Sequence, residues 1–254
     1  MYRQEYRKQR MAAVCARNMG AAVFELSPDE WTAVRLSLQI ALTATAFSLP
    51  VGILAAYALA RWRFPGKVLL DGVIHLPLVL PPVVTGYILL MLLGRRGVLG
   101  GFLADYLGIV FSFRWTGAAL ACGVMGFPLM VRAIRLSIEA IDRRLEDAAG
   151  TLGANPIWTF ALVTLPLAVP GVVVGAILCF AKALGEFGAT ITFVSNIPGE
   201  TQTISAAIFT YTQVPGGDAN AWRLTAVAIV IALAALIVSE IVQRQASHRL
   251  AQFE

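Results

Sequence analysis

Two pairs of ionisable residues, each spaced four residues apart, are the first candidates for chemistry in this chain. Lys182 precedes Glu186, which is followed by Phe187, and Asp71 precedes His75. Residues at this spacing share one face of a helix, so each pair can form an ion pair or pass a proton. Only 14% of the 254 residues are charged and 58% are hydrophobic, so these pairs require either a functional or a structural explanation.

Arrangements typical of catalysis or metal binding are missing from the sequence. The three cysteines, at positions 15, 122 and 179, show neither metal-ligand spacing nor a disulfide pattern. There are two histidines, His75 and His248, and no Ser/His/Asp set or pair of catalytic carboxylates. A phosphate-binding G-x-x-x-x-G-K-S/T loop is also lacking. We therefore expect no catalytic residue, no metal and no bound cofactor in this chain.

Five apolar runs without charged residues are the elements that must position the ionisable pairs. They cover residues 36–60, 72–94, 115–131, 157–181 and 224–239. A helix of about 20 residues crosses a bilayer, and spans are helical because unpaired backbone groups are costly in hydrocarbon. The sequence predicts an all-α integral membrane protein with its termini on opposite sides. Pro77, Pro81 and Pro82 predict a kinked or unwound second span.

Basic residues lie between the apolar runs, where they anchor loops to lipid headgroups, so the net charge of +5 does not indicate nucleic-acid binding. If the 61–67 loop is cytoplasmic, several other basic residues also lie on that side, as the positive-inside rule requires: Arg143, Arg144, Arg244 and Arg249. Others would then face outward: the N-terminal cluster, Arg95, Arg96 and Arg114. Charge alone leaves the orientation divided.

Residues 1–26 differ from the rest of the chain. Their apolar stretch is short and is broken by Arg17, which is atypical of a signal peptide or a span. We expect a disordered or surface-lying extension, or residues that precede a true start at Met11 or Met19. Residues 27–254 form the expected transmembrane domain.

The polar segment 142–158, DRRLEDAAGTLGANPIW, separates the third and fourth runs. Its apolar residues recur at three- and four-residue intervals, which predicts a short amphipathic helix: Leu145, Ala148, Ala149 and Leu152. Gly153 is typical of a helix stop, and Asn155 and Pro156 of the cap and first residue of the next helix. Such a helix either lies at the headgroup surface or docks into a partner. Its largely alanine face favours docking, because alanine gives little membrane affinity but permits close approach.

The same segment resembles the motif of ABC-importer permeases that runs Glu-Ala-Ala, three residues, Gly, nine residues, Ile, one residue, Leu-Pro. The matching residues are Asp147, Ala148, Ala149, Gly153, Val163, Leu165 and Pro166. Asp147 and Val163 replace the usual Glu and Ile, and Glu146 stands one place early. In that family the segment is a cytoplasmic coupling helix seated in a groove of the ATPase subunit. The resemblance implies the same role here and a cytoplasmic position for residue 147.

From about residue 28 to 243 the chain is similar to molybdate ABC transporter permeases, notably in RWRFPGKVLLDGVIHLPLVLPPVVTGYILL, GFPLMVRAIRLSIEAID and ALGEFGATITFVSNIPGETQTI. Sulfate and thiosulfate permeases resemble parts of these stretches, notably GEFGA. The resemblance implies a type I ABC-importer permease fold in the bacterial inner membrane. It also implies a homodimer, ATPase subunits that carry ATP and Mg, and an external oxyanion-binding protein. The implied function is import of molybdate by alternating access, with tungstate or sulfate/thiosulfate as alternatives.

An oxyanion substrate changes the interpretation of the charged residues. Direct coordination by Glu186 is unfavourable, so we interpret Lys182, Glu186 and Phe187 as a hinge or gate, with a structural ion pair as the alternative. His75 is a packing residue or a ligand, and Asp71 is expected to pair with Lys67. Arg95 and Arg96 are interfacial anchors or attract the anion.

Two other classes of function remain as alternatives. An ion-coupled secondary transporter would use Glu186, Asp71 and His75 as a relay, but it predicts inverted repeats that five dissimilar spans do not show. An intramembrane enzyme would need a clustered nucleophile and base, which the sequence lacks.

Overall fold

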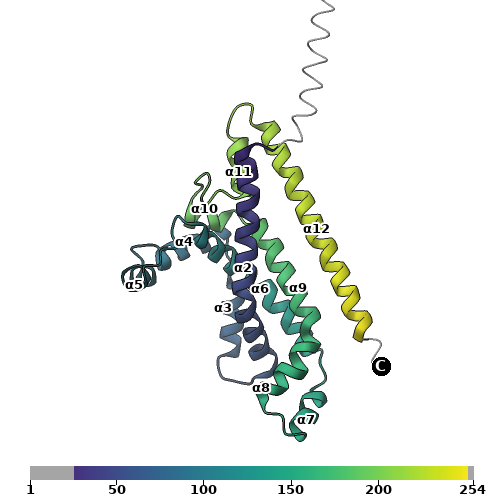
Figure 1. The fold of residues 1–254 in the computed structure, drawn as a ribbon. Helices are drawn as coiled ribbons and strands as arrows, with labels where there is room; N and C mark the ends of the chain where they lie inside the picture. The colour runs from purple at the N-terminus through teal and green to yellow at the C-terminus, as the bar shows by residue number, and fades with distance from the viewer. Residues whose placement is uncertain (1–25, 251–254) are drawn as a thin grey trace, which may run out of the picture.

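The computed structural model describes residues 26–250 of the chain (Figure 1). The predictions for residues 1–25 fall outside this range. The described residues form helices joined by short loops, as the sequence predicts. The helices are α2 (Pro28–Arg61), α3 (Lys67–Val79), α4 (Pro82–Leu93), α5 (Val98–Leu107), α6 (Trp115–Glu139), α7 (Arg143–Thr151), α8 (Pro156–Thr159), η1 (Phe160–Thr164), α9 (Leu165–Leu184), α10 (Gly188–Val194), α11 (Ile204–Thr212) and α12 (Asp218–Leu250).

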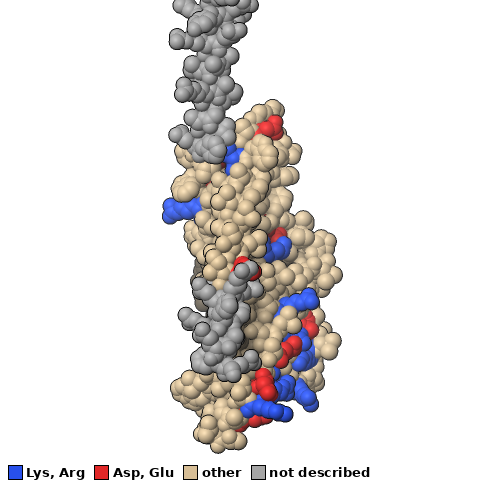
Figure 2. Space-filling view, turned by 90° about the vertical axis from the view of Figure 1, so that its right-hand side faces the viewer, with Lys and Arg blue, Asp and Glu red and all other residues tan. Residues whose placement is uncertain are grey.

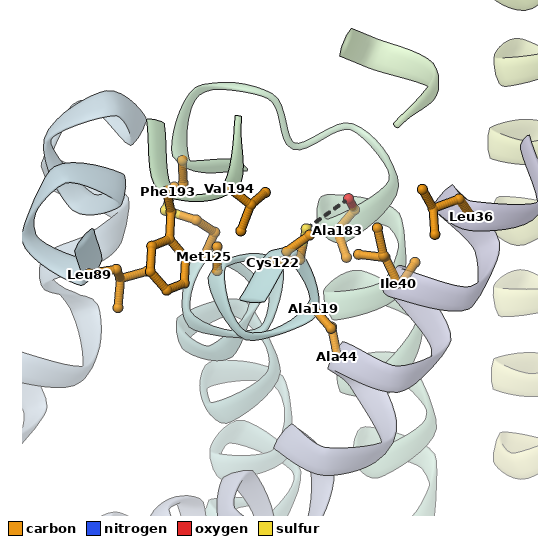
Figure 3. Close-up of a cluster of buried hydrophobic side chains, with 14 residues drawn as sticks. Leu36, Ile40, Ala44, Leu89, Ala119, Cys122, Met125, Ala183, Phe193 and Val194 are labelled. Atoms are coloured by element: carbon orange, nitrogen blue, oxygen red, sulfur yellow. Dashed lines mark hydrogen bonds between the residues drawn. The ribbon is translucent and has the colours of Figure 1, made fainter. Parts of the chain in front are cut away.

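Helix α6 lies at the centre of the bundle, between α2 and α9 (Figure 1). The first halves of α2 and α6 share one core with α10, in which Ile40, Cys122 and Phe193 are fully buried (Figure 3). The second halves of α2 and α6 share another core, which contains Leu59 and Ile134. The two helices therefore run in the same direction, so the chain returns across the molecule between them.

Glycines allow these helices to approach closely. A Cβ atom at Gly126 of α6 would lie 2.7 Å from the sulfur of Cys179 in α9, and one at Gly175 of α9 would lie 2.9 Å from the carbonyl oxygen of Met130 in α6. Small residues at helix contacts are the usual means of tight packing between membrane helices. They hold α6 and α9 in a fixed register, which positions the segments that precede and follow α9.

The second span is broken rather than kinked. The axis of the span bends by 116° between α3 and α4, at a break formed by Leu80 and Pro81. Pro81 and Pro82 have no amide hydrogen to continue the helical ladder, and Leu80 is extended, with φ −72° and ψ 143°. Residues 26–250 therefore contain four continuous helices long and apolar enough to span a membrane, and a fifth span if the bent pair is counted as one.

The fourth span begins irregularly. It passes from α8 through the π-helical turn η1 into α9. Pro166 cannot donate to the carbonyl four residues earlier, and the preceding Leu165 donates instead to the carbonyl of Phe160, five residues earlier. The π-helical turn thus ends directly before Leu165 and Pro166, the last two residues of the coupling motif.

Helix α12 is joined to the bundle near its first residues. It contacts α11 and α9, and then diverges from the other helices (Figure 1). Near its start, Arg223 donates to the fully buried carboxylate of Glu30 in α2 at 3.0 Å. The start of α2 and the end of α12 lie at opposite ends of the molecule, as an odd number of spans requires.

Candidate functional sites

Helix α7 lies at one extreme end of the molecule, beside α8 (Figure 1); we call this the α7 end. Asp142 caps its start by accepting from the amide of Arg144 at 2.9 Å. At its end, the amide of Ala154 donates to the carbonyl of Ala149, and that of Gly153 donates to the carbonyl of Gly150. This is a Schellman motif, and Gly153 has the left-handed φ of +87° that it requires.

The turn into the fourth span also follows the prediction. Asn155 accepts from the amide of Trp158 at 2.9 Å, and Pro156 is the first helical residue. Proline is suited to that position because its missing amide hydrogen would have had no helical partner. The chain therefore forms a short helix, turns and re-enters the bundle within 17 residues, 142–158.

Helix α7 is almost wholly unburied. No residue of α7 is buried, and the apolar side chain of Leu145 is 50% exposed. Beyond the helix, Leu152 is 89% exposed, and Ile157 and Trp158 are exposed as well. Large apolar side chains are thus exposed at the α7 end, and the acidic Asp147 of α7 is exposed as well. This surface can be covered by another protein without rearrangement of the bundle.

Glu146 differs from the other α7 residues of the predicted coupling set because its carboxylate contacts the bundle. Its carboxylate lies 3.0 Å from Nε of Arg61, the last residue of α2, and it accepts from Oγ1 of Thr164 at 2.8 Å. Asp147, its neighbour, is exposed. The two adjacent carboxylates therefore have opposite roles in the structure, one directed into the protein and one directed to its surroundings.

Charged side chains gather toward the lower end of the molecule in Figure 2, where α7 lies. The elements of the α7 end supply seven basic residues: Arg61, Arg63, Lys67, Arg132, Arg135, Arg143 and Arg144. Arg95 and Arg96 are exposed in the turn between α4 and α5. An excess of Lys and Arg is typical of the cytoplasmic side of a membrane protein. Six other basic residues with described side chains lie outside the α7 end, so charge favours a cytoplasmic α7 end by a small margin only: Arg35, Arg95, Arg96, Arg114, Lys182 and Arg223.

Glu186 lies in the break between α9 and α10 and is 2% exposed. Its Oε2 lies 2.7 Å from Nζ of Lys182, and its Oε1 accepts from the amide of Ala189 at 3.0 Å. The predicted pair is therefore formed. The carboxylate also caps the first turn of α10, so it holds the helix break in place. A gate and a structural ion pair are both compatible with this geometry.

The break at Glu186 packs directly against the break in the second span. A Cβ atom at Gly188 would lie 2.8 Å from Cβ of Pro82, and one at Gly86 would lie 2.5 Å from the carbonyl oxygen of Ala189. Phe187, the third candidate gate residue, packs on Phe209 of α11 with ring centroids 5.1 Å apart. Two interrupted helices thus meet at their interruptions, next to the buried core of Figure 3.

Asp71 and His75 share one helix face, as predicted, but the expected partner of Asp71 is wrong. Asp71 pairs with Nη1 of Arg135 in α6 at 3.2 Å, whereas Lys67 donates to the carbonyl of Trp62. His75 Nδ1 lies 2.9 Å from the backbone oxygen of Asp71. The pair therefore belongs to a contact between α3 and α6. It lies far along the chain from Glu186.

The sequence reasoning missed Arg61, Thr164 and the pair of Glu30 with Arg223. Arg61 and Glu146 are 85 residues apart, so no local spacing relates them. Thr164 lies inside the coupling motif, between the matching Val163 and Leu165, and its polarity in an apolar run was the one available signal.

Comparison with known proteins accounts for this architecture. Residues 48–252 match the family described as the inner membrane component of binding-protein-dependent transport systems. The chain belongs to this family. It is therefore an inner-membrane transport component, and the predicted class of protein is confirmed.

Individual relatives extend the comparison. The chain is 56% identical over 224 residues to the molybdenum transport system permease protein ModB of Escherichia coli (strain K12), covering 88% of this chain and 98% of that protein. It is 37% identical over 183 residues to the sulfate transport system permease protein CysT of Salmonella typhimurium, covering 72% and 66%. The fold resembles that of a bacterial ABC transporter that imports alginate, with a TM-score of 0.67 at 18% identity over 91% of this chain and 83% of that chain.

Proposed function

We propose that this chain is the permease subunit of an ATP-driven importer that carries molybdate across the inner membrane by alternating access. The observation that carries the proposal is the 56% identity to a molybdenum permease over nearly its whole length. The relative with a sulfate permease name is less similar and covers less of the chain, so sulfate and thiosulfate are less favoured substrates. Tungstate has the same charge and shape as molybdate and remains an alternative to it.

Helix α7 is proposed to couple this chain to a cytoplasmic ATPase subunit. Its exposed apolar tip and its absence of buried residues support docking into a groove. The coupling set comprises Glu146, Asp147, Ala148, Ala149, Gly153, Leu165 and Pro166. ATP and Mg belong to the ATPase subunit. Closure of two such subunits around ATP would move two copies of α7 together and rock the spans as rigid bodies.

A gate is proposed where the two helix breaks meet. Lys182 and Glu186 hold the end of α9 against the start of α10, and Phe187 connects this break to α11. Movement of α9 would be transmitted to α4 through the close glycine contacts, while Glu186 maintains the shape of the break. The charged pair would then act as the hinge of the gate rather than as a ligand of the anion.

A second copy of this chain and an external binding protein complete the proposed assembly. The pathway would run between the two copies, and the binding protein would select the anion before delivery. Membrane lipid covers the remaining apolar surface. Because the binding protein selects the anion, a chain with few polar residues in its spans can transport a divalent oxyanion.

The experiment is ATP-dependent uptake of labelled molybdate into proteoliposomes that contain this chain, its ATPase subunit and its binding protein. We expect uptake that competes with unlabelled molybdate and is insensitive to excess sulfate. A matched assembly whose ATPase subunit cannot hydrolyse ATP is the control. Uptake without ATP, or driven by a proton or sodium gradient, would contradict the proposal. Much stronger competition by tungstate than by unlabelled molybdate would reassign the substrate.

A further inference from the structure

We infer that Glu146 is a positioning residue that fixes α7 to α2 and α9 together, so that motion of α7 reaches both helices at once. This inference rests on the proposed function of α7 as the coupling helix. Glu146 stands apart from the other α7 residues of the coupling set because its carboxylate contacts the bundle, as described above. The three groups that meet there, Arg61, Glu146 and Thr164, are called the α7 anchor.

The first side of the α7 anchor is the end of α2. Nε of Arg61 lies 3.0 Å from both carboxylate oxygens of Glu146, and the two side chains are 8% and 15% exposed. Nη2 of Arg61 also donates to the carbonyl of Ile141 at 3.1 Å. The guanidinium therefore holds the helix itself and the linker that precedes it. A planar group with several donors is suited to this double contact, and a lysine would not replace it.

The second side of the α7 anchor is the start of the fourth span. Oγ1 of Thr164 donates to Oε1 of Glu146 at 2.8 Å, and Thr164 is fully buried. Thr164 is the last residue of the π-helical turn, directly before α9. The wider turn places this hydroxyl at the level of α7. One carboxylate thus joins α7 to the end of α2, 85 residues away, and to the turn that leads into α9, 18 residues away.

Helix α7 has few attachments to the bundle besides the α7 anchor. No residue of α7 is buried, and its caps at Asp142 and Gly153 are internal to the segment. Without the α7 anchor, the helix would be held by its contacts with α8 and η1 and by its two linkers. It could then tilt about Gly153 when pushed. A buried ion pair is a poor source of stability, but it specifies one arrangement, which is what a coupling element requires.

The test compares charge-removing variants in the complete complex, with ATPase subunit and binding protein, in proteoliposomes. The anchor variants are Glu146→Gln and Arg61→Gln. The control variants are Glu200→Gln and Arg63→Gln, which change exposed residues of the same types. The readout is the number of ATP molecules hydrolysed per molybdate taken up, with assembly checked by size-exclusion chromatography. We expect this ratio to rise at least about fivefold in the two anchor variants and to stay at the wild-type value in the two controls.

The double variant and a third site sharpen the test. Because both charges serve one contact, Glu146→Gln combined with Arg61→Gln is expected to be no worse than the poorer single variant. Thr164→Val is expected to raise the ratio less, since it removes one neutral donor. Amide hydrogen exchange of residues 143–151 provides a second measurement, and faster exchange is expected in every anchor variant. A wild-type ratio in Glu146→Gln would overturn the inference, whatever the exchange rate.

Failure of this inference is distinguishable from failure of the proposed function. If the wild-type complex takes up no molybdate with ATP, the proposed function is wrong. If the wild-type complex transports and both anchor variants assemble and transport with the wild-type ratio, only the positioning role of Glu146 is wrong.

Discussion

The α7 anchor and the break at Glu186 both use a shielded carboxylate and a single basic partner, but they differ in what the contact joins. At Glu186 the partner is Lys182, four residues away, and the carboxylate also caps the next helix. At Glu146 the partner is Arg61, 85 residues away, on a different helix. A local pair stabilises an irregularity within one stretch of chain, whereas a distant pair makes separate helices move as one. The carboxylate of Glu186 thus maintains the shape of a helix break, whereas the carboxylate of Glu146 transmits motion of α7 to other helices.

The largest effect is expected at the local pair. Lys182→Met would leave the carboxylate of Glu186, whose side chain is 1% exposed, without its cation. Removing one partner of a buried pair costs about 3 kcal/mol. We expect a corresponding drop in thermal stability of the purified subunit in detergent, together with loss of uptake. Glu186→Gln keeps an acceptor for the amide of Ala189 and is expected to be milder. Wild-type stability in Lys182→Met would show that the pair is dispensable.

The packing of the two helix breaks gives the next effect. Gly86→Ala would place a Cβ atom 2.5 Å from the carbonyl oxygen of Ala189, a backbone atom that cannot turn aside. Overpacking of this kind costs about 2 kcal/mol. We expect reduced uptake with normal assembly of the complex. Gly72→Ala, where nothing lies within 4 Å, is the matched control. Equal uptake in the two variants would contradict a close contact between the breaks.

A smaller effect is expected where α7 ends. Gly153→Ala would force a side chain into the left-handed conformation at φ +87°, at a cost of about 1 kcal/mol. We expect weaker binding of the ATPase subunit, measured by titration against the detergent-solubilised chain. Gly150→Ala is the control, because Gly150 is helical and nothing lies within 4 Å of its added Cβ atom. If both variants bind the ATPase subunit equally well, binding does not depend on the shape of the turn.

The smallest effect is expected at the other cap of α7. Asp142→Ala would remove the acceptor for the amide of Arg144 and destabilise the first turn by about 1 kcal/mol or less. The α7 anchor would still hold the helix, so we expect coupling to change little while amide exchange near residue 144 increases. If Asp142→Ala changed the ratio of ATP hydrolysed to molybdate taken up as much as Glu146→Gln does, coupling would depend on the stability of α7 itself rather than on the α7 anchor.

Local features of the fold could be predicted from the sequence because local signals determine them. The short amphipathic helix, its stop at Gly153 and the restart at Asn155 and Pro156 follow from capping preferences of single residues. The four-residue spacing of Lys182 and Glu186 predicted their contact. The apolar runs located the spans because the bilayer imposes one length and one backbone geometry.

Features set by packing could not be predicted in this way. Prolines predicted an irregular second span, but the 116° bend also depends on where α4 packs against α10. Lys67 is nearer to Asp71 in sequence, yet Arg135 lies closer in space. The direction of Glu146 is determined by the end of α2, and no neighbouring residue indicates it. The role of Glu146 within the coupling set therefore became visible only in three dimensions.

The most direct test of the account is the accessibility of Leu152 at the tip of the α7 end. Leu152→Cys, in a chain whose Cys15 is replaced by serine, would be labelled with a membrane-impermeant maleimide; Cys122 and Cys179 are buried. We predict labelling in inside-out vesicles but not in right-side-out vesicles, and protection when the ATPase subunit is bound. Labelling from the outside, or labelling that the bound ATPase subunit does not reduce, would contradict a cytoplasmic coupling role for α7.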